Sequence, residues 1–235
     1  MKAERIAALQ EAEDLLIRGF PVFVAAFSRN APFAKPAQLS AHQETIAIRK
    51  AADSVRAALH DPEFLDALYA TLRAWGIGMR GSRLVDRRAF AANLQRREAE
   101  IAALENVSLD SPILDVADVG ARVWRLIKSV QLVENKAVLV PSTKALHHVL
   151  PDLVVPMDRA YTRPFFGWHE PEFQSHQARC FEHAFGAFHR VARGANPRQY
   201  VGSGWNTSLS KVIDNAVVGV FVVGKAFLGC QKSAG

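Results

Sequence analysis

Cysteine is scarce in this chain, and nothing in the sequence indicates a disulfide framework. The 235 residues include two cysteines, Cys180 and Cys230. Disulfide-stabilised secreted domains need several paired cysteines, so a reducing compartment is the simpler expectation. The N-terminal segment MKAERIAALQEAEDLL is amphipathic and carries acidic residues, unlike a secretory signal. We therefore expect a cytoplasmic protein.

The chain also lacks a hydrophobic run long enough to cross a membrane. Its most apolar stretch, residues 216–230, contains Lys225. At about 15 residues it is shorter than the roughly 20 apolar residues of a helical span. We expect no membrane partner.

Alternating apolar and polar residues, the pattern of a half-buried strand, are absent, as are repeats and low-complexity tracts. Apolar residues instead recur at helical spacing, separated by Gly and Pro. We predict an all-α fold, with one helical domain over residues 1–235 that could divide into closely packed lobes 1–110 and 111–235. The expected helices span about 3–18 (ended by Gly19 and Pro21), 40–59, 62–75 (capped by Asp61), 84–104, 113–132, 142–150, 171–193 and 208–228.

Acidic residues are outnumbered by basic ones. There are 29 Lys and Arg against 23 Asp and Glu, a formal net charge of +6. Such an excess suits a polyanion or an anionic membrane surface, although a protein can be basic without either partner. One cluster, Arg87, Arg88, Arg96 and Arg97, falls on a single expected helix. Clusters of this kind are more often a solvated face than a phosphate-binding surface.

Residues 138–167, VLVPSTKALHHVLPDLVVPMDRAYTRPFFG, form the most informative stretch. An apolar face at helical spacing predicts a short helix that Pro151 ends. Asp158 follows at the expected start of another helix, with Arg159 and Arg163 one turn apart behind it. A carboxylate ordered at a helix N-terminus between two arginines indicates a functional residue.

The letters PMDRAYTR at residues 156–163 resemble the P-V-D-x-x-V-x-R segment of the helix-hairpin-helix DNA glycosylases. Residues 141–144, PSTK, lie where that family has its hairpin turn and following helix. The resemblance is close over residues 138–167 and loose over 110–170. It implies a two-lobed helical fold acting on double-stranded DNA with an extruded base. It also implies that Asp158 is the catalytic carboxylate and that Lys144 stands where lyase-active members carry a Schiff-base lysine.

The expected chemistry centres on Asp158. Cleavage of an N-glycosidic bond builds positive charge on the deoxyribose, and a fixed carboxylate near C1′ stabilises it. The alternative is that Asp158 only caps a helix or pairs with Arg159 or Arg163.

Two roles are open for Lys144. Its amine could attack C1′ as a nucleophile if its pKa is lowered. It could instead bind a phosphate near the helix N-terminus, with Ser142 and Thr143 adding donors. We favour the phosphate role and a monofunctional enzyme, because the sequence offers no clear device for lowering this pKa.

Further candidates lie on loops and aromatic segments. The glycine-punctuated turn over residues 76–82 is either a plain connection between helices or a loop that touches substrate, beside Trp75 and Arg80. Aromatic residues could wall the pocket for an extruded base, whereas Phe181, Phe185 and Phe188 are expected in the core. The predicted base pocket comprises Tyr161, Phe165, Trp168, Trp205 and Asn206, and the predicted DNA contacts are Ser142, Thr143, Lys144, Arg159, Arg163 and Arg80.

No metal or other cofactor is predicted. His176, Cys180 and His183 share one helix face and could begin a zinc site. No further ligands stand at the spacing of a known zinc module, so a partly polar face is the preferred interpretation.

The leading functional hypothesis is a monomeric, DNA-associated glycosylase that hydrolyses off a damaged or modified base and leaves an abasic site. The base is open, and a phage-modified base in bacterial defence is one candidate. A non-catalytic DNA-binding module on the same scaffold is the alternative. An unrelated helical enzyme acting on a small molecule is the third hypothesis.

Overall fold

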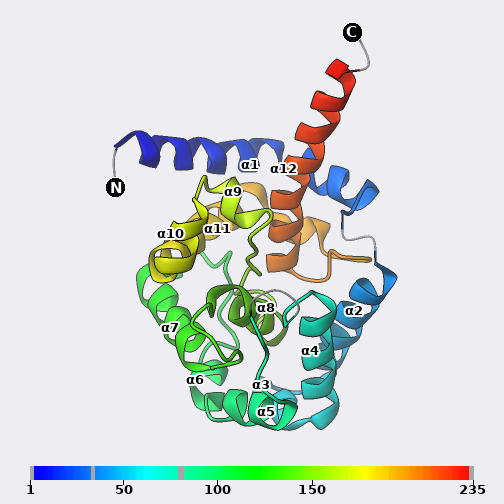
Figure 1. Cartoon of the computed structure of the whole chain (residues 1–235), viewed down its shortest axis with the longest axis vertical. Helices are drawn as coiled ribbons and strands as arrows, with labels where there is room; N and C mark the ends of the chain where they lie inside the picture. Colours follow the sequence, from blue (N-terminus) through cyan, green and yellow to red (C-terminus); the bar gives the residue numbers. More distant parts are fainter. Residues whose placement is uncertain (1–2, 33–34, 79–81, 233–235) are drawn as a thin grey trace.

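The computed structural model describes residues 3–32, 35–78 and 82–232, and side chains from residue 9 to residue 224 within those ranges. Every regular element in the described part of the chain is helical, which confirms the all-α prediction (Figure 1). The helices are α1 (Ala3–Arg29), α2 (Pro36–Ala51), α3 (Val55–His60), α4 (Pro62–Ala74), α5 (Arg87–Gln95), α6 (Glu98–Ala102), α7 (Val116–Ser129), α8 (Leu139–Val149), α9 (Thr162–Phe165), α10 (Glu170–Ser175), α11 (Gln177–Ala195), the 3₁₀ turn η1 (Pro197–Tyr200) and α12 (Leu209–Lys232).

Helix α1 does not end at Gly19 and Pro21 as predicted but continues to Arg29. Pro21 removes one backbone hydrogen bond, which on its own disfavours a helix interior. The apolar stripe nevertheless continues beyond it, and Phe23 and Phe27 are buried. Burial of these rings therefore outweighs the local preference for a break.

Helices α1 and α12 cross closely near the top of Figure 1. The crossing depends on Gly219 in α12, because a Cβ atom there would lie 2.0 Å from the carbonyl oxygen of Phe23. A side chain at this position would force the two helices apart.

Three of the other predicted helices are each divided in two. The run predicted over 40–59 becomes α2 and α3, and Ser54 caps α3 by accepting a hydrogen bond from the Ala57 amide at 3.0 Å. The runs over 84–104 and 171–193 become α5 with α6 and α10 with α11. The predicted cap of α4 is confirmed, since the Asp61 carboxylate accepts from the Glu63 amide and Pro62 is the first helical residue.

Helix α8 lies in the middle of the molecule, in contact with α2, α4 and α7 (Figure 1). One isolated antiparallel bridge, Leu84 to Val133, joins the loops that precede α5 and follow α7. A contiguous apolar cluster extends from Leu9 to Val217, and Phe181, Phe185 and Phe188 belong to it as predicted. None of the helices in the described part of the chain combines the length and hydropathy of a membrane span.

Candidate active site

Asp158 lies in a turn four residues before α9 begins. Its Oδ1 accepts hydrogen bonds from the backbone amides of Tyr161 at 2.6 Å and Thr162 at 3.2 Å. The Thr162 hydroxyl accepts in return from the Asp158 amide at 3.0 Å. Asp158 and Thr162 thus each accept a hydrogen bond from the other's backbone amide, as the two residues of a capping box do. These bonds fix the orientation of the carboxylate. The Asp158 side chain therefore closes the turn before α9, whose N-cap residue is Tyr161.

The alternative in which Asp158 pairs with Arg159 or Arg163 is wrong. Arg159 and Arg163 instead face Glu170 at the start of α10, at nitrogen–oxygen distances of 3.7 and 2.8 Å. Glu170 is five residues beyond the end of α9, and the turn around Gly167 brings it back over the two guanidinium groups. The pair of arginines is thus partly neutralised, which weakens its expected role as a phosphate contact.

A pocket of about 410 Å³ opens beside Asp158. It is built from segments far apart in the sequence, and α8 and α12 contribute charged side chains to it. Trp75, at the end of α4, and Trp205, in the loop before α12, form aromatic walls. The lining residues are Gln38, Trp75, Lys144, Pro156, Asp158, Trp205, Lys211 and Asp214.

Lys211 and Asp214 form a buried ion pair at the inner end of α12. The Nζ–Oδ2 distance is 2.5 Å, and the two side chains are 2% and 9% exposed. The ammonium group also lies 5.4 Å from the ring centroid of Trp75 and 5.3 Å from that of Trp205. Burial raises the pKa of Asp214, and the adjacent Lys211 opposes that shift. The pocket therefore contains a fixed cation within aromatic walls.

Lys144 reaches the same pocket from α8. Its ammonium group lies 5.5 Å from the centroid of the Trp75 ring. The residue as a whole is partly exposed, but protein atoms surround its ammonium group. This burial lowers the pKa of Lys144, while the charges of Asp158 and Asp214 oppose the shift. The device for lowering the pKa of this lysine, which the sequence did not reveal, is thus burial.

A wider groove of about 1210 Å³ lies outside the pocket. Trp75, Lys144 and Asp158 line both hollows and so form the boundary between them. The groove continues along the first turn of α8 and along Gly76 and Gly78, whose φ angles of +82° and +97° require glycine. The turn predicted after α4 is therefore confirmed up to residue 78 and borders the groove.

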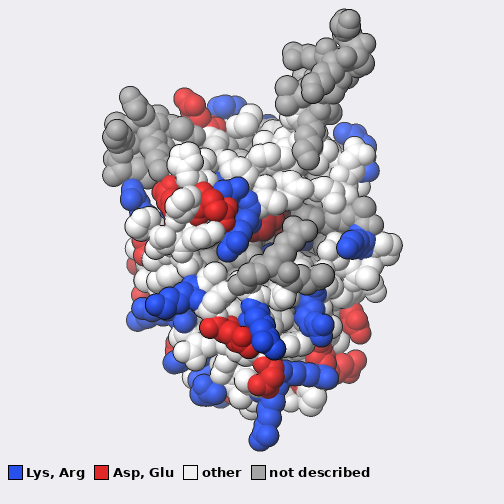
Figure 2. Space-filling model, in the orientation of Figure 1, with Lys and Arg blue, Asp and Glu red and all other residues white. Residues whose placement is uncertain are grey.

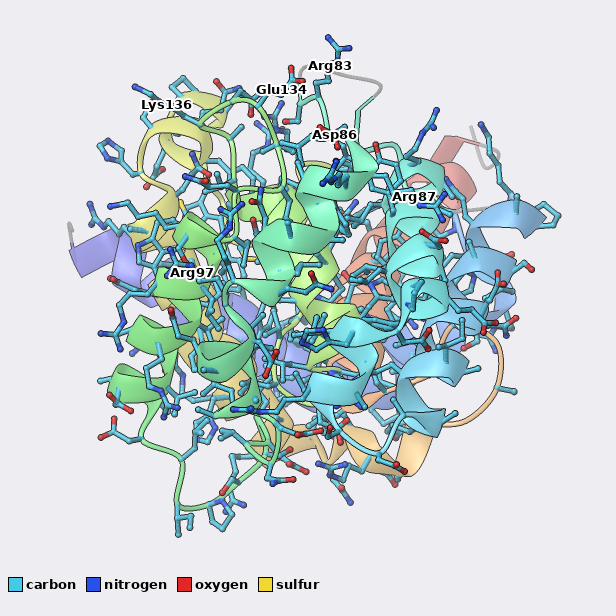
Figure 3. The ribbon with its side chains drawn as sticks, turned by 90° about the horizontal axis from the view of Figure 1, so that it is seen from below. Arg83, Asp86, Arg87, Arg97, Glu134 and Lys136 are labelled. Carbon is cyan, nitrogen blue, oxygen red and sulfur yellow. The ribbon has the colours of Figure 1, made fainter. Side chains whose placement is uncertain are left out.

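Charges of both signs lie around the groove. Ser82 and Ala137 line it, and their neighbours Arg83 and Lys136 project from the adjoining loops (Figure 3). Arg83 lies 3.7 Å from Glu134, and both side chains are exposed. Figure 2 shows the same mixture over the visible face, with basic and acidic side chains interspersed. The net positive charge is therefore not concentrated in one patch on this face.

The basic cluster predicted on one helix is divided: Arg87 and Arg88 lie in α5, and Arg96 and Arg97 lie between α5 and α6. Arg87 pairs with Asp66, and Arg97 lies 3.0 Å from Glu100 (Figure 3). These two arginines thus belong to surface ion pairs, which agrees with the preferred interpretation as a solvated face.

Most of the predicted base-pocket residues lie elsewhere. Trp205 lines the pocket, but Phe165 and Trp168 are buried in the aromatic core against Phe166. Tyr161 packs on Phe221 with ring centroids 5.7 Å apart. The Asn206 side chain instead accepts a hydrogen bond from Asn215 at 2.8 Å, which anchors the Trp205 loop to α12. Of the five predicted base-pocket residues, only Trp205 lines this pocket.

The hydroxyl groups of Ser142 and Thr143 are fully buried, so the predicted phosphate contacts are wrong for these side chains. The Thr143 hydroxyl donates to the Leu139 carbonyl at 2.8 Å and accepts from the Met157 amide at 3.2 Å. It thereby holds the backbone next to Asp158. Arg80, the remaining predicted contact, lies outside the described residues.

Three buried histidines lie behind the pocket, and they were not singled out in the sequence. His42 packs on Trp75 and Trp205 with centroid distances of 5.3 and 5.6 Å. His147 and His148 follow Lys144 by three and four residues, on the same side of α8. Burial lowers the pKa of each of the three, that of His148 to about 4.

Patterns in the sequence could have indicated several of these residues. Lys211 and Asp214 stand three residues apart beside the apolar residues Val212 and Ile213, and burying such charges is costly unless they meet. His147 and His148 are consecutive polar residues within an apolar helical pattern.

Comparison with protein-family models, curated proteins and solved structures finds no match to this chain.

Proposed function

We propose that this chain is a DNA glycosylase of the helix-hairpin-helix type that hydrolyses the N-glycosidic bond of a damaged or modified base. One observation carries the proposal: Asp158 is held rigidly at the boundary between an aromatic-walled pocket and an open groove. The sequence resemblance assigns the catalytic role to this same carboxylate. The location of Asp158 suits a reaction in which one part of the substrate enters the pocket and the rest stays outside.

In the proposed reaction the base leaves the duplex and enters the pocket between Trp75 and Trp205. The sugar then lies at the boundary, where the charge of Asp158 stabilises the developing oxocarbenium ion. Two amide hydrogen bonds preorganise the carboxylate, so little reorganisation is needed during the reaction. The groove along the first turn of α8 receives the phosphates on either side of the extruded nucleotide.

Lys144 decides between two forms of this chemistry. A hydrolytic enzyme uses water and leaves an abasic site, whereas a lyase attacks C1′ with a neutral amine. The lowered pKa of Lys144 favours the amine form more than the sequence alone did. We retain hydrolysis as the proposed reaction, and borohydride distinguishes the two. A covalent adduct with DNA that Lys144→Ala abolishes would establish the lyase.

The test of the proposal is excision from duplex DNAs that carry different base lesions and modifications, detected as alkali-labile sites. Asp158→Asn keeps the hydrogen-bond acceptor but removes the charge, and we expect excision to slow by about 10²–10³. DNA affinity should hold or rise, because one negative charge leaves a site for a polyanion. Full excision by this variant would remove Asp158 from the catalytic role.

A matched control separates catalysis from helix capping. Asp115 caps α7 by accepting from the Asp118 amide at 2.9 Å, as Asp158 caps the turn before α9. Asp115 is not among the residues that line the pocket. Asp115→Asn should therefore leave excision unchanged. Equal loss in both variants would indicate a structural role for Asp158.

The mixed charge of the visible face favours a second candidate, an enzyme acting on a small molecule. It would use the same pocket without the groove. The salt dependence of DNA affinity separates the candidates, because each neutralised phosphate adds about 0.9 to the log–log slope. Affinity unchanged between low and moderate salt would remove the DNA proposal. Salt-dependent binding without excision of any base would indicate a DNA-binding module.

A further inference from the structure

The buried histidines His42, His147 and His148 have the geometry of a metal site. All three side chains are 0% exposed. Their ring centroids are 4.9, 5.0 and 5.7 Å apart. One ring nitrogen from each lies within 4.8 Å of one from each of the others. Among the residues that the structure describes, no other group of three His, Cys, Asp or Glu side chains is gathered in this way.

The hydrogen bonds of His148 and His147 show which nitrogen carries the proton. Nδ1 of His148 lies 2.8 Å from the Lys144 carbonyl oxygen, which can only accept, so this nitrogen is protonated. Nδ1 of His147 lies 2.8 Å from the Ser210 hydroxyl. That hydroxyl donates its own hydrogen to the Pro151 carbonyl at 2.6 Å, so it accepts from His147. Both histidines are therefore left with a lone pair on Nε2.

The Nε2 atom of His147 is fully buried and has no hydrogen-bond partner among the described residues. Buried nitrogen lone pairs without a partner are rare in folded proteins, because the group loses its bond to water and gains nothing in return. Nε2 of His148 faces Nδ1 of His42 at 2.9 Å. A cation between the three rings would give His147 the partner that it lacks.

His42 can supply the third lone pair. Its Nε2 lies 2.8 Å from the Thr207 hydroxyl, which can donate or accept. Without a cation, Nδ1 of His42 donates to His148. When Nε2 carries the hydrogen and donates to Thr207, Nδ1 is free to act as a ligand. Thr207 therefore supports either tautomer of the ring.

We propose that His42, His147 and His148 form a buried zinc site, with Nδ1 of His42 and Nε2 of the other two as ligands. Tetrahedral zinc with Zn–N bonds of about 2.0–2.1 Å places ligand rings roughly 5 Å apart, close to the observed spacing. Each ligand's other nitrogen is held by a carbonyl or hydroxyl group, which is the usual outer support of zinc-bound histidine.

This site would join α2 to α8 directly behind the proposed active site. His148 bonds the Lys144 carbonyl, and His42 packs on both tryptophans of the pocket. The positive charges of Lys211, Lys144 and Lys50 act on these histidines, so zinc binding must outweigh their repulsion, which the pairing of Lys211 with Asp214 offsets only in part. The inference does not depend on the proposed reaction, because its readout is metal binding.

The test is a titration of the metal-free full-length protein with Zn²⁺ in competition with a chromophoric chelator. We expect one equivalent to bind and the melting temperature to rise. Co²⁺ in its place should give the intense visible bands of a tetrahedral nitrogen site. Less than a tenth of an equivalent bound, or the spectrum of a fully hydrated Co²⁺ ion, would overturn the proposal.

Variants locate the bound metal. His147→Asn keeps a donor for Ser210 but lacks the Nε2 ligand, and zinc affinity should fall by more than the roughly 100-fold typical of outer-shell changes. His42→Asn, on the other helix, should act alike, and circular dichroism checks that both variants fold. The matched control is His176→Asn, on the face first considered for zinc. Unchanged affinity in both site variants, or an equal loss in the control, would contradict the assignment.

Discussion

Helices α8 and α11 both border the apolar core, but they bury different kinds of side chain. The buried face of α11 consists of small and aromatic apolar groups, among them Phe181, Phe185 and Phe188. Helix α8 also buries Leu146 and Val149, yet two histidines and two hydroxyl residues are buried beside them. One helix follows the simple separation of apolar inside from polar outside, and the other does not.

The difference shows that apolar packing accounts for the buried face of α11 but not for that of α8. Buried polar groups cost free energy unless they find partners, so they are retained where they serve a purpose. Partners for His148, His147 and Thr143 of α8 come from α2, α12 and the loop around Asp158, whereas Ser142 Oγ and His147 Nε2 have none among the described residues. The candidate active site and the histidine cluster both lie at this polar centre, whereas α11 supplies rigid support.

Among the changes that test this comparison, the largest loss of stability is expected in the apolar core beside α11. Phe185 is 4% exposed and packs on Phe181 and against Gly120 of α7. Phe185→Ala should lower the free energy of unfolding by about 3–5 kcal/mol, through lost burial and the cavity left behind. Urea denaturation measures the change. Ile113→Ala is the control, since Ile113 is 91% exposed and its loss should change little.

The polar centre should respond differently to single and double changes. Asp214→Leu leaves the Lys211 ammonium buried without its anion, and such losses cost about 3–5 kcal/mol. We expect the lower end, because Trp75 and Trp205 still face the cation. Replacing both residues, with Lys211→Met added, should recover most of the stability.

Urea denaturation of both variants tests this interpretation of the ion pair. A double variant as unstable as the single one would show that packing, not charge, sets the cost. The proposed excision should still be impaired in the double variant, because both side chains line the pocket.

The same contrast explains how far the sequence could lead. Helical periodicity predicted the all-α class, the cap at Asp61 and the burial of the α11 phenylalanines, because these depend on local spacing. The resemblance to the glycosylase segment singled out Asp158 and Lys144, and a loop aromatic added Trp205; these three do meet at one pocket. The spacing of residues in the sequence is enough to predict a feature that depends on a single helix and the residues next to it.

Long-range packing decided what the sequence did not predict. Lys211 and Asp214 reach the pocket from a helix that begins more than fifty residues after Lys144. His42 joins His148 across 106 residues. Phe165 and Trp168 were assigned to a pocket because they belong to an aromatic-rich segment, whereas both rings pack against Phe166 in the core. Sequence proximity was a poor guide to contact there.

The smallest expected effect concerns a polar network near the surface. Arg198 of η1 donates to both carboxylate oxygens of Asp110, and Ser108 donates to one of them. Burial alone would raise the pKa of Asp110, but the hydrogen bonds from Arg198 and Ser108 lower it below its ordinary value. A lowered pKa means that the folded state binds this proton less readily than the unfolded state does. The network therefore stabilises the fold above the ordinary pKa of about 4, and the contribution is lost as the pH falls through the folded value.

Because the Asp110 carboxylate is in contact with water, screening should limit its contribution to about 1 kcal/mol or less. Unfolding by urea at several pH values measures it. Asp110→Asn should be less stable than the parent by a constant amount from pH 7 to about 5, and the difference should shrink below about pH 4. The exposed Asp53→Asn serves as the control and should show no such trend. A difference that stays constant down to about pH 2 would mean that Asp110 acts through packing, as Phe185 does, and not through its charge.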